Sequence, residues 1–313
     1  MKPQITIAVP SHNHAVKLLK TVQSVLLQTE RNWELFIVDD QSTDSAWHVA
    51  QMLSHQDNRI HCEQNPHSLG ILNSYHYAAS KGQAPYLLLL NRGDQLTPHF
   101  LRYVMQCLDD NPSTALVCGR QIVFDPHTHR YVPYATPLRG TYSAGRTIAR
   151  ALANGNLYGS FSSVVINRNA LASIGGIRND DLWTHDFETF IQISTRCPIT
   201  FVSDAEIYQH IDNKIIKSLL TSEMVDSEIA TLNRLLSDSY VRQYLQTADI
   251  ENAWHRIHAL KWSAVLYQIT HDWAKLARIR RHLQGQQLPI SCSAGKILTT
   301  MARLIYQRYR LTY

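Results

Sequence analysis

The stretch ITIAVPSHNHAVKLLKTVQSVLLQTERNWELFIVDDQSTD, residues 5–44, decides the fold class of this chain. Its two short runs at 5–9 and 34–38 are rich in β-branched residues, as buried strands are. Between them, apolar residues recur every three to four positions over 15–27, which predicts an amphipathic helix. Strand, helix and strand in such close succession indicate a βαβ unit with parallel strands.

The alternation continues beyond this unit. Helical periodicity covers 45–54 and 71–81, and strand-like runs cover 59–64 and 86–90. The pattern therefore predicts an α/β fold around a mainly parallel sheet, whose ligands bind beyond the carboxyl ends of the strands. The polar residues that follow the strands are accordingly the candidate site, and they stand at 10–13, 39–42 and 91–94.

The C-terminal third differs in composition from the rest. Residues 1–213 carry a net charge of −2, whereas residues 214–313 carry +7 and have a helical pattern. This asymmetry predicts two domains, 1–213 and 214–313. The 44% of hydrophobic residues are typical of a globular protein, and no apolar run is long enough to span a bilayer. Without signal-peptide features at its start, the protein is expected in the cytoplasm.

The last forty-one residues, 273–313, hold eight basic and no acidic residues, and an apolar helical face lies within 294–313. Such a helix suits peripheral docking on the anionic inner face of a membrane. Packing of the same face on the catalytic domain, or on a second copy in a homodimer, is the alternative. The five cysteines are scattered without a CxxC pair, and no HExxH pattern occurs, so neither a zinc cluster nor a disulfide framework is expected.

The first forty residues also resemble a known family. The order of strand-Pro-x-x-Asn, helix, and strand-Asp-Asp-x-Ser-x-Asp is similar to the start of family 2 glycosyltransferases, which have the GT-A fold. The similarity continues through Gly70 to Asp94, and resumes at SSVVINRNALASIGG (162–176) and at His185-Asp186. It covers about residues 3–213. It implies an inverting transferase that moves a sugar from a nucleotide donor, UDP-linked by default, to a hydroxyl of a glycan or glycolipid in bacterial surface-glycan assembly. No nucleic acid is expected among the partners.

The acids after the second strand are the first candidates for donor binding. A carboxylate there can accept hydrogen bonds from a uracil-type N–H or a ribose hydroxyl, and Asp39 is preferred over its neighbour Asp40. The alternative is that both acids, like Asp44, cap the helix that begins near Ser45. The donor-binding residues predicted after the first strand are Pro10, His12 and Asn13.

The fourth strand ends in Asn91-Arg92-Gly93-Asp94, where the family has an Asp-x-Asp-Asp-like cluster. Only Asp94 keeps an acid. Because Mg²⁺ or Mn²⁺ can be held by one carboxylate together with phosphates and water, Asp94 is predicted to be a metal ligand. Arg92 is a donor-binding candidate that could neutralise phosphate instead, unless it is simply exposed. His210 is either a further metal ligand or a structural histidine.

A second departure from the family lies at Ser74-Tyr75-His76, which replaces a small-Arg-Asn stretch. It implies an unusual donor or a loss of activity. The alternative to an active enzyme is therefore a catalytically degenerate GT-A protein that serves as a binding or scaffolding subunit.

In the family, the general base follows a Gly-Gly-Phe-like turn, which appears here as Gly175-Gly176-Ile177. Asp186 matches this base, and His185 replaces the Glu that usually precedes it. The alternative for Asp186 is an acid that favours the first turn of a helix. Trp183 and His185 are assigned to the acceptor, Trp183 as a platform for a sugar ring or else as a core residue.

Overall fold

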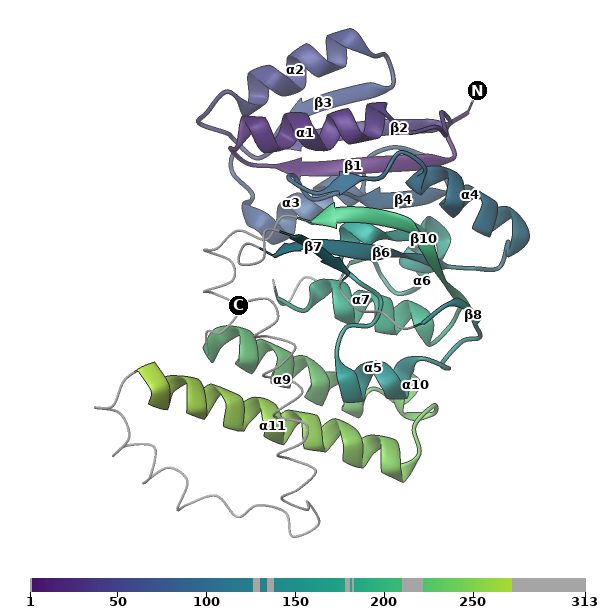
Figure 1. Cartoon of the computed structure of the whole chain (residues 1–313), viewed down its shortest axis with the longest axis vertical. Helices are drawn as coiled ribbons and strands as arrows, with labels where there is room; N and C mark the ends of the chain where they lie inside the picture. The colour runs from purple at the N-terminus through teal and green to yellow at the C-terminus, as the bar shows by residue number, and fades with distance from the viewer. Residues whose placement is uncertain are drawn as a thin grey trace. The chain divides into compact units, whose positions relative to one another are not determined.

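A computed structural model describes residues 2–125, 130–133, 138–177, 181, 183–209 and 222–271 of this chain. The chain forms two compact units. The first contains the sheet and the helices that cover it, and the second contains helices α5, α9, α10 and α11 (Figure 1). The predicted boundary at residue 213 falls outside the described residues, as does the basic segment 273–313, so both stay predictions.

The described strands form one mixed sheet in the order β3-β2-β1-β4-β9-β6-β10-β5, with β7 paired to β6 and β8 to β10. They are β1 (Ile5–Ser11), β2 (Trp33–Asp39), β3 (Ile60–Gln64), β4 (Tyr86–Leu89), β5 (Gln95–Leu96), β6 (Leu116–Asp125), β7 (Arg130–Pro133), β8 (Gly140–Tyr142), β9 (Val164–Asn167) and β10 (Ile199–Gln209). β1 to β4 run parallel, and β9 is antiparallel to both β4 and β6. The predicted α/β class with a βαβ start is confirmed.

The helices of the first unit include those predicted at 15–27 and 71–81. They are α1 (Ala15–Leu26), α2 (Ala46–Gln56), α3 (Gly70–Ala79), α4 (Phe100–Asp110), α6 (Arg168–Ser173) and α7 (His185–Ser194), with a 3₁₀ turn η1 (Phe161–Ser163). The second unit holds α5 (Ile148–Asn154), α9 (Ser222–Ser237), α10 (Ser239–Arg242) and α11 (Thr247–His271). None of the described helices is long and apolar enough to cross a membrane.

The two faces of the sheet bury different helices. Alternate strand residues, such as Ile7, Leu88 and Ile207, form one core with the apolar faces of α1, α2 and α4. Each such fully buried side chain contributes about 1.5–3 kcal/mol to folding. Helix α3 packs against β1, β2 and β4 but takes no part in that core. Since successive strand residues point to opposite faces, α3 covers the other face of the same strands.

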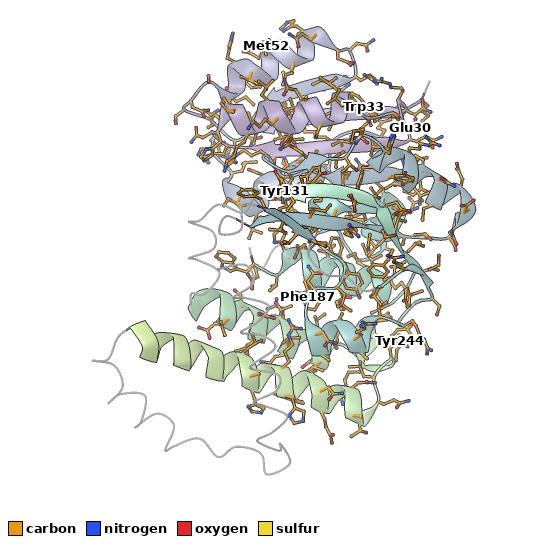
Figure 2. The ribbon with its side chains drawn as sticks, viewed as in Figure 1. Glu30, Trp33, Met52, Tyr131, Phe187 and Tyr244 are labelled. Atoms are coloured by element: carbon orange, nitrogen blue, oxygen red, sulfur yellow. The ribbon has the colours of Figure 1, made fainter. Side chains whose placement is uncertain are left out.

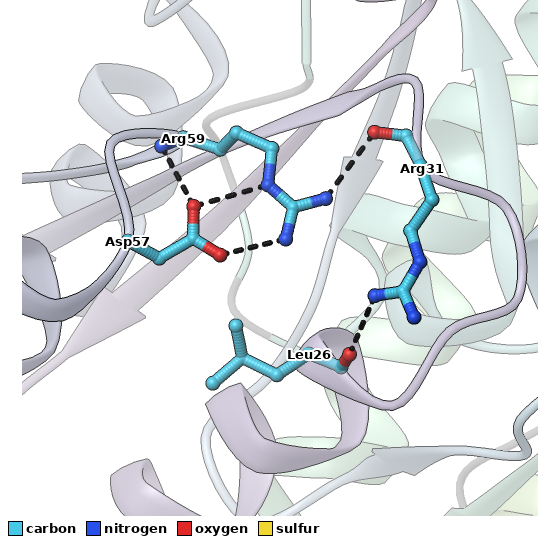
Figure 3. Close-up of polar contacts among 4 residues, drawn as sticks. All are labelled: Leu26, Arg31, Asp57 and Arg59. Atoms are coloured by element: carbon cyan, nitrogen blue, oxygen red, sulfur yellow. Dashed lines mark hydrogen bonds and ion pairs between the residues drawn. The ribbon is translucent and has the colours of Figure 1, made fainter.

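Arg59 stabilises the start of β2 through its contacts with neighbouring loops (Figure 3). Its guanidinium carbon lies 3.7 Å from the centre of the Trp33 ring, and its Nη2 and Nε lie 2.6 and 3.0 Å from the carboxylate of Asp57. The hydrogen bonds from Arg59, opposed by burial, lower the pKa of Asp57. Arg59 also donates to the carbonyl of Arg31 at 3.3 Å. The labels of Trp33 and Glu30 in Figure 2 show where β2 begins.

Arg168 fixes the C-terminal end of α3. This first residue of α6 donates from Nε to the carbonyl of Ala84 at 2.9 Å, from Nη1 to that of Ala79 at 2.7 Å, and from Nη2 to that of Lys81. Burial lowers the pKa of the Arg168 guanidinium, against the attraction of Glu34. Three charge-assisted hydrogen bonds therefore hold the last residue of α3 and the segment that joins α3 to β4.

A buried arginine also organises the second unit. Arg256 of α11, 3% exposed, donates from Nη1 to the carbonyls of Ala151 and Leu152 in α5 at 3.1 and 2.9 Å, and pairs with Glu228 of α9. One guanidinium thus satisfies the C-terminal carbonyls of α5 and joins three helices.

Candidate active site

Asn13 and His12 join the loops that follow β1 and β2. Asn13 has a left-handed backbone (φ 59°), donates from its N–H to Ser42 Oγ at 2.7 Å, and accepts from the N–H of Thr43 at 2.8 Å. His12 donates from Nδ1 to the carbonyl of Asp40 at 2.8 Å. Both side chains thus shape the loops, and Pro10 lies buried in β1 beneath them. Their donor-binding roles stay predictions.

Asp39 ends β2 and is fully buried. Its Oδ2 accepts from the N–H of Ser42 at 3.0 Å and from Nε2 of Gln64 at 2.9 Å, and its Oδ1 accepts from Ser42 Oγ. A carboxylate has about four acceptor positions, so these three donors leave one for a ligand. Asp44 accepts from the N–H of Ala46 at 2.9 Å, and so supports the start of α2 from the position before the N-cap, which is Ser45 and not Asp44 as predicted.

Asp40 holds the start of α3. Its Oδ1 accepts from Asn65 Nδ2 at 2.8 Å and Leu69 N–H at 2.7 Å, and its Oδ2 accepts from Ser68 Oγ at 2.9 Å and Gly70 N–H at 3.0 Å. Burial acts to raise the pKa of Asp40, but the four hydrogen bonds together lower it. Its acceptor positions are filled by the protein itself. The donor-binding role predicted for Asp40 therefore has no support in this geometry.

Asp94 lies just beyond β4 and is 4% exposed. Its Oδ2 is buried without a hydrogen-bond partner among the described residues. Burial raises the pKa of Asp94 to about 7, against hydrogen bonds with the side chains of Ser162 and Asn91 and the charge of Lys17. This oxygen is buried, unsatisfied and located at the carboxyl ends of parallel strands, where ligands bind. A positive charge on a ligand or a metal ion would therefore stabilise it there.

Tyr75 is influenced by both predicted site acids. This half-buried residue of α3 donates its hydroxyl to Asn91 Oδ1, and its ring centre lies 5.3 Å from that of His185 in an edge-on arrangement. Burial raises the pKa of Tyr75, and the negative charges of Asp94 and Asp186 raise it further. The phenol is therefore close to both carboxylates. The sequence marked this position as a departure from the family but assigned it no role.

Asp186 is the second residue of α7. Its Oδ1 accepts from the N–H of Phe187 at 2.6 Å, as expected for an acid in the first helical turn. Burial raises the pKa of Asp186, against the charge of His185 and backbone hydrogen bonds. The His185 ring packs 5.2 Å from Phe161, which also contacts Tyr75. Trp183 is half-buried just before α7, and its backbone N–H donates to Asp181 Oδ1 at 2.8 Å.

Arg92 supplies positive charge to the same region. Its side chain is half-buried, and its Nε is buried with no hydrogen-bond partner among the residues that the structure describes. Burial lowers the pKa of Arg92, while Tyr75 and Asp44 act to raise it. The site thus combines two acids, Asp94 and Asp186, with the cation Arg92, and within the described part of the chain neither acid forms an ion pair with it.

The residues present fit a divalent cation through one ligand. Within the described ranges, no three His, Cys, Asp or Glu side chains come together as a metal cluster. The orphaned Oδ2 of Asp94 is nevertheless a hard oxygen ligand, and Mg²⁺ or Mn²⁺ commonly takes one or two carboxylates and completes its shell with phosphate and water. His210, the other predicted metal ligand, lies outside the described residues.

Comparison with known proteins places this site in context. Residues 6–175, more than half of the chain, match the model of glycosyl transferase family 2. A putative teichuronic acid biosynthesis glycosyltransferase of Bacillus subtilis, TuaG, is 33% identical over 94 residues, which are 30% of this chain and 37% of TuaG. WfaP of Escherichia coli, a UDP-Glc:alpha-D-GlcNAc-diphosphoundecaprenol beta-1,3-glucosyltransferase, is 30% identical over 90 residues, 29% of this chain and 35% of WfaP. The matched segments span less than half the length of these relatives.

Solved structures share the fold. S. aureus TarS 1–349 in complex with UDP-GlcNAc superposes with a TM-score of 0.66 at 14% identity, over 99% of this chain and 88% of that chain. The mannosyltransferase PcManGT from Pyrobaculum calidifontis, in complex with GDP-Man and Mn²⁺, gives a TM-score of 0.61 at 12% identity, over 100% and 88%. The predicted GT-A architecture is thereby confirmed. The family match contains Asp39, Tyr75 and Asp94, whereas Asp186 lies beyond it.

Proposed function

This chain belongs to glycosyl transferase family 2, and from that premise we propose that it transfers one sugar from a UDP-sugar to a hydroxyl of a glycan acceptor, with inversion at the anomeric carbon. The observation that carries the proposal is that two acids from different elements, Asp94 after β4 and Asp186 at the start of α7, are both close enough to Tyr75 for their charges to raise its pKa. Asp94 suits a cation that neutralises the donor diphosphate, and Asp186 suits the hydroxyl of the acceptor. A single base is what an inverting displacement requires.

The donor side follows from charge and hydrogen bonding. The fourth acceptor position of Asp39 suits a uracil N–H or a ribose hydroxyl, and Pro10 near the end of β1, with His12 and Asn13 of the loop after it, are the other residues proposed to bind the donor. Arg92, with an unsatisfied Nε, suits the diphosphate. The UDP-sugar substrate in the name of WfaP and the UDP-GlcNAc bound to TarS support a uridine donor.

A divalent cation fits beside these groups. Asp94 would hold it through Oδ2, and Mn²⁺ or Mg²⁺ would neutralise the charge that develops on the leaving diphosphate. The Mn²⁺ in the structure of PcManGT supports this assignment. The role of Arg92 is to share that charge, which is useful where the sequence retains a single acid.

Asp186 performs the proton transfer. As the acceptor oxygen forms its bond to the anomeric carbon, the bond from that carbon to the diphosphate breaks, and the hydroxyl proton passes to the Asp186 carboxylate. The raised pKa of Asp186 makes its carboxylate a better proton acceptor than an ordinary aspartate. His185, whose ring contacts Phe161 and Tyr75, and Trp183 border the acceptor side.

We assign the acceptor to bacterial surface-glycan assembly, in line with the teichuronic acid and diphosphoundecaprenol named in the relatives. We also propose a cytoplasmic location. The basic segment 273–313, which lies outside the described residues, is proposed either to dock on the anionic inner face of a membrane or, as the alternative, to pack on the catalytic domain or on a second copy in a homodimer. A degenerate scaffolding subunit is the competing function, favoured by the single retained acid after β4.

The deciding experiment screens nucleotide sugars by thermal shift and donor hydrolysis, with Mn²⁺ and with EDTA. A ligand at a hundredfold excess over its Kd adds about 2.7 kcal/mol of stability, which a melting curve resolves. We expect a UDP-sugar to bind with Mn²⁺, and Asp186→Asn to bind it equally while losing transfer. The control is Asp110→Asn, an exposed acid at the end of α4. Binding without any hydrolysis or transfer in the unsubstituted chain would favour the scaffolding subunit.

A further inference from the structure

Strand β3 is the outermost strand at one side of the sheet, and among the described strands it pairs with β2 alone (Figure 1). At its two ends, Leu35 N–H donates to the carbonyl of Arg59 and Asn65 N–H donates to the carbonyl of Asp39, both at 2.8 Å. In a parallel ladder such bonds recur at every second residue. Positions 59, 61, 63 and 65 therefore bond to β2, and positions 60, 62 and 64 direct their N–H and C=O groups away from the sheet.

These outward backbone groups are largely open. Ile60 N–H donates to the carbonyl of Asp57 at 3.0 Å, whereas the N–H and C=O groups of Cys62 and Gln64 form no hydrogen bond within the described part of the chain. Proline and β-bulges are two devices by which a sheet edge avoids pairing with a further strand. β3 has no proline, and its register with β2 is unbroken. The edge can therefore accept another strand.

The side chains of β3 divide between the two faces of the sheet. Ile60 belongs to the core that includes α2, and Cys62 donates from Sγ to Ser54 Oγ of α2 at 3.3 Å. His61 and Glu63 are exposed, and by the alternation of a strand they lie on the opposite face. One face of the edge thus presents a histidine and an acid two positions apart.

Both exposed side chains are held in position by neighbours. The His61 ring centre lies 4.7 Å from that of Phe36 on β2. Glu63 accepts from Lys81 Nζ at 2.5 Å and from the hydroxyl of Tyr77, and these hydrogen bonds, opposed by burial, lower the pKa of Glu63. The carboxylate is therefore ionised near neutral pH. Since a carboxylate has about four acceptor positions, two remain for further donors such as an imidazole N–H.

The edge is complementary to itself. A two-fold axis through Cys62, perpendicular to the sheet, makes two copies of β3 antiparallel and pairs position 60 with 64 and position 61 with 63. Cys62 then exchanges both backbone hydrogen bonds with its equivalent, and the C=O of Ile60 accepts from the N–H of Gln64. His61 lies opposite Glu63 of the second copy, twice by symmetry. Pairs of opposite charge at such positions stabilise antiparallel strands.

We propose that β3 is an interaction surface for a second copy of this chain, and that the two sheets join through an antiparallel β3–β3 pair. The self-complementary placement of His61 and Glu63 and the open backbone of Cys62 favour this occupant over an unrelated strand. The surface is distinct from the basic segment 273–313, and the inference does not depend on the proposed function. Because the strands of the two copies run in opposite directions, the two candidate active sites open in opposite directions.

The test is sedimentation velocity of the full chain at increasing concentration near neutral pH. Cys62→Pro removes an outward N–H, which a proline on an edge strand can lack without breaking the ladder to β2, and Cys62→Ala is its matched control. His61→Glu places two acids opposite each other, whereas His61→Lys keeps opposite charges. We expect the unsubstituted chain, Cys62→Ala and His61→Lys to dimerise. Cys62→Pro and His61→Glu should raise the dimer Kd about tenfold or more, because each change acts twice by symmetry.

A chain that stays monomeric at every concentration would overturn the proposal. A dimer that persists equally in Cys62→Pro and His61→Glu would overturn it too, because its interface would lie elsewhere, and equal weakening by His61→Glu and His61→Lys would contradict the antiparallel register. Melting curves are recorded for each variant. If Cys62→Pro does not fold, His61→Glu decides alone, since it changes an exposed side chain. Donor binding and transfer, measured separately, test the proposed function whatever the oligomeric state.

Discussion

Replacing Asp94 with Asn should stabilise the metal-free protein, increasingly so as the pH rises. Burial raises the pKa of Asp94 from 3.8 to about 7. Below pH 4 the carboxyl is protonated in both the folded and unfolded states, and it imposes no pH dependence. Above that, the unfolded chain releases its proton first, so folding loses free energy until the pH passes about 7. At about 1.4 kcal/mol per pH unit over the shift from 3.8 to about 7, the loss reaches about 4 kcal/mol at pH 8.

The assay is urea unfolding of the unsubstituted chain and of Asp94→Asn in EDTA, at intervals from pH 4 to pH 8. Only the difference between the two proteins is interpreted, because other groups titrate equally in both. The difference should grow across this range in favour of Asp94→Asn, and Mn²⁺ with UDP should stabilise the unsubstituted chain alone at pH 8. A difference that stays constant with pH would show that Asp94 is not held in an unsatisfied, buried environment, and would remove the basis for its metal role.

Three further predictions concern individual side chains. Asp186→Asn should reduce transfer about 10²–10⁴-fold in a steady-state assay, as loss of a general base does, and an unchanged rate would exclude this base. Tyr75→Phe keeps the ring but leaves Asn91 Oδ1 without its donor, so it should cost about 1–3 kcal/mol in urea unfolding; an unaltered midpoint would contradict the hydrogen bond. Arg168→Ala leaves three carbonyls without a charged donor and should cost about 3 kcal/mol or more, whereas Arg102→Ala, exposed on α4, should cost little.

The first ninety residues could be interpreted from sequence because their local pattern and their tertiary environment agree. The period of 15–27 and the two β-branched runs gave α1, β1 and β2 within a residue or two. The roles of the adjacent acids could not be separated in the same way. Asp39 and Asp40 differ in structure because all four donors to Asp40 come from 65–70, a segment that only folding brings to the end of β2, whereas Asp39 receives two of its three from the nearby Ser42.

The facing of the second half of β10 was beyond the reach of sequence patterns for a different reason. Strict alternation from Phe201 would put Ala205 on the same face as Phe201. The pairing of β10 with β6 instead shifts register between Val202 and Glu206, and Ala205 joins the core on the opposite face. A bulge of this kind exchanges the two faces for every later residue, including Tyr208. No local signal in 199–209 marks that exchange.

The balance of charge at the site bears on whether the protein is an enzyme or a scaffold. Burial raises the pKa of Asp94 and of Asp186 and lowers that of Arg92, so each of the three groups is ionised at a cost to folding. Asp40, by contrast, has four donors and a lowered pKa, which shows that this fold can satisfy a buried acid where its structure depends on one. A binding subunit would gain stability from neutral residues at the three costly positions. A transferase needs them charged, because a donor diphosphate, its cation and an acceptor proton complete the site only while the reaction takes place.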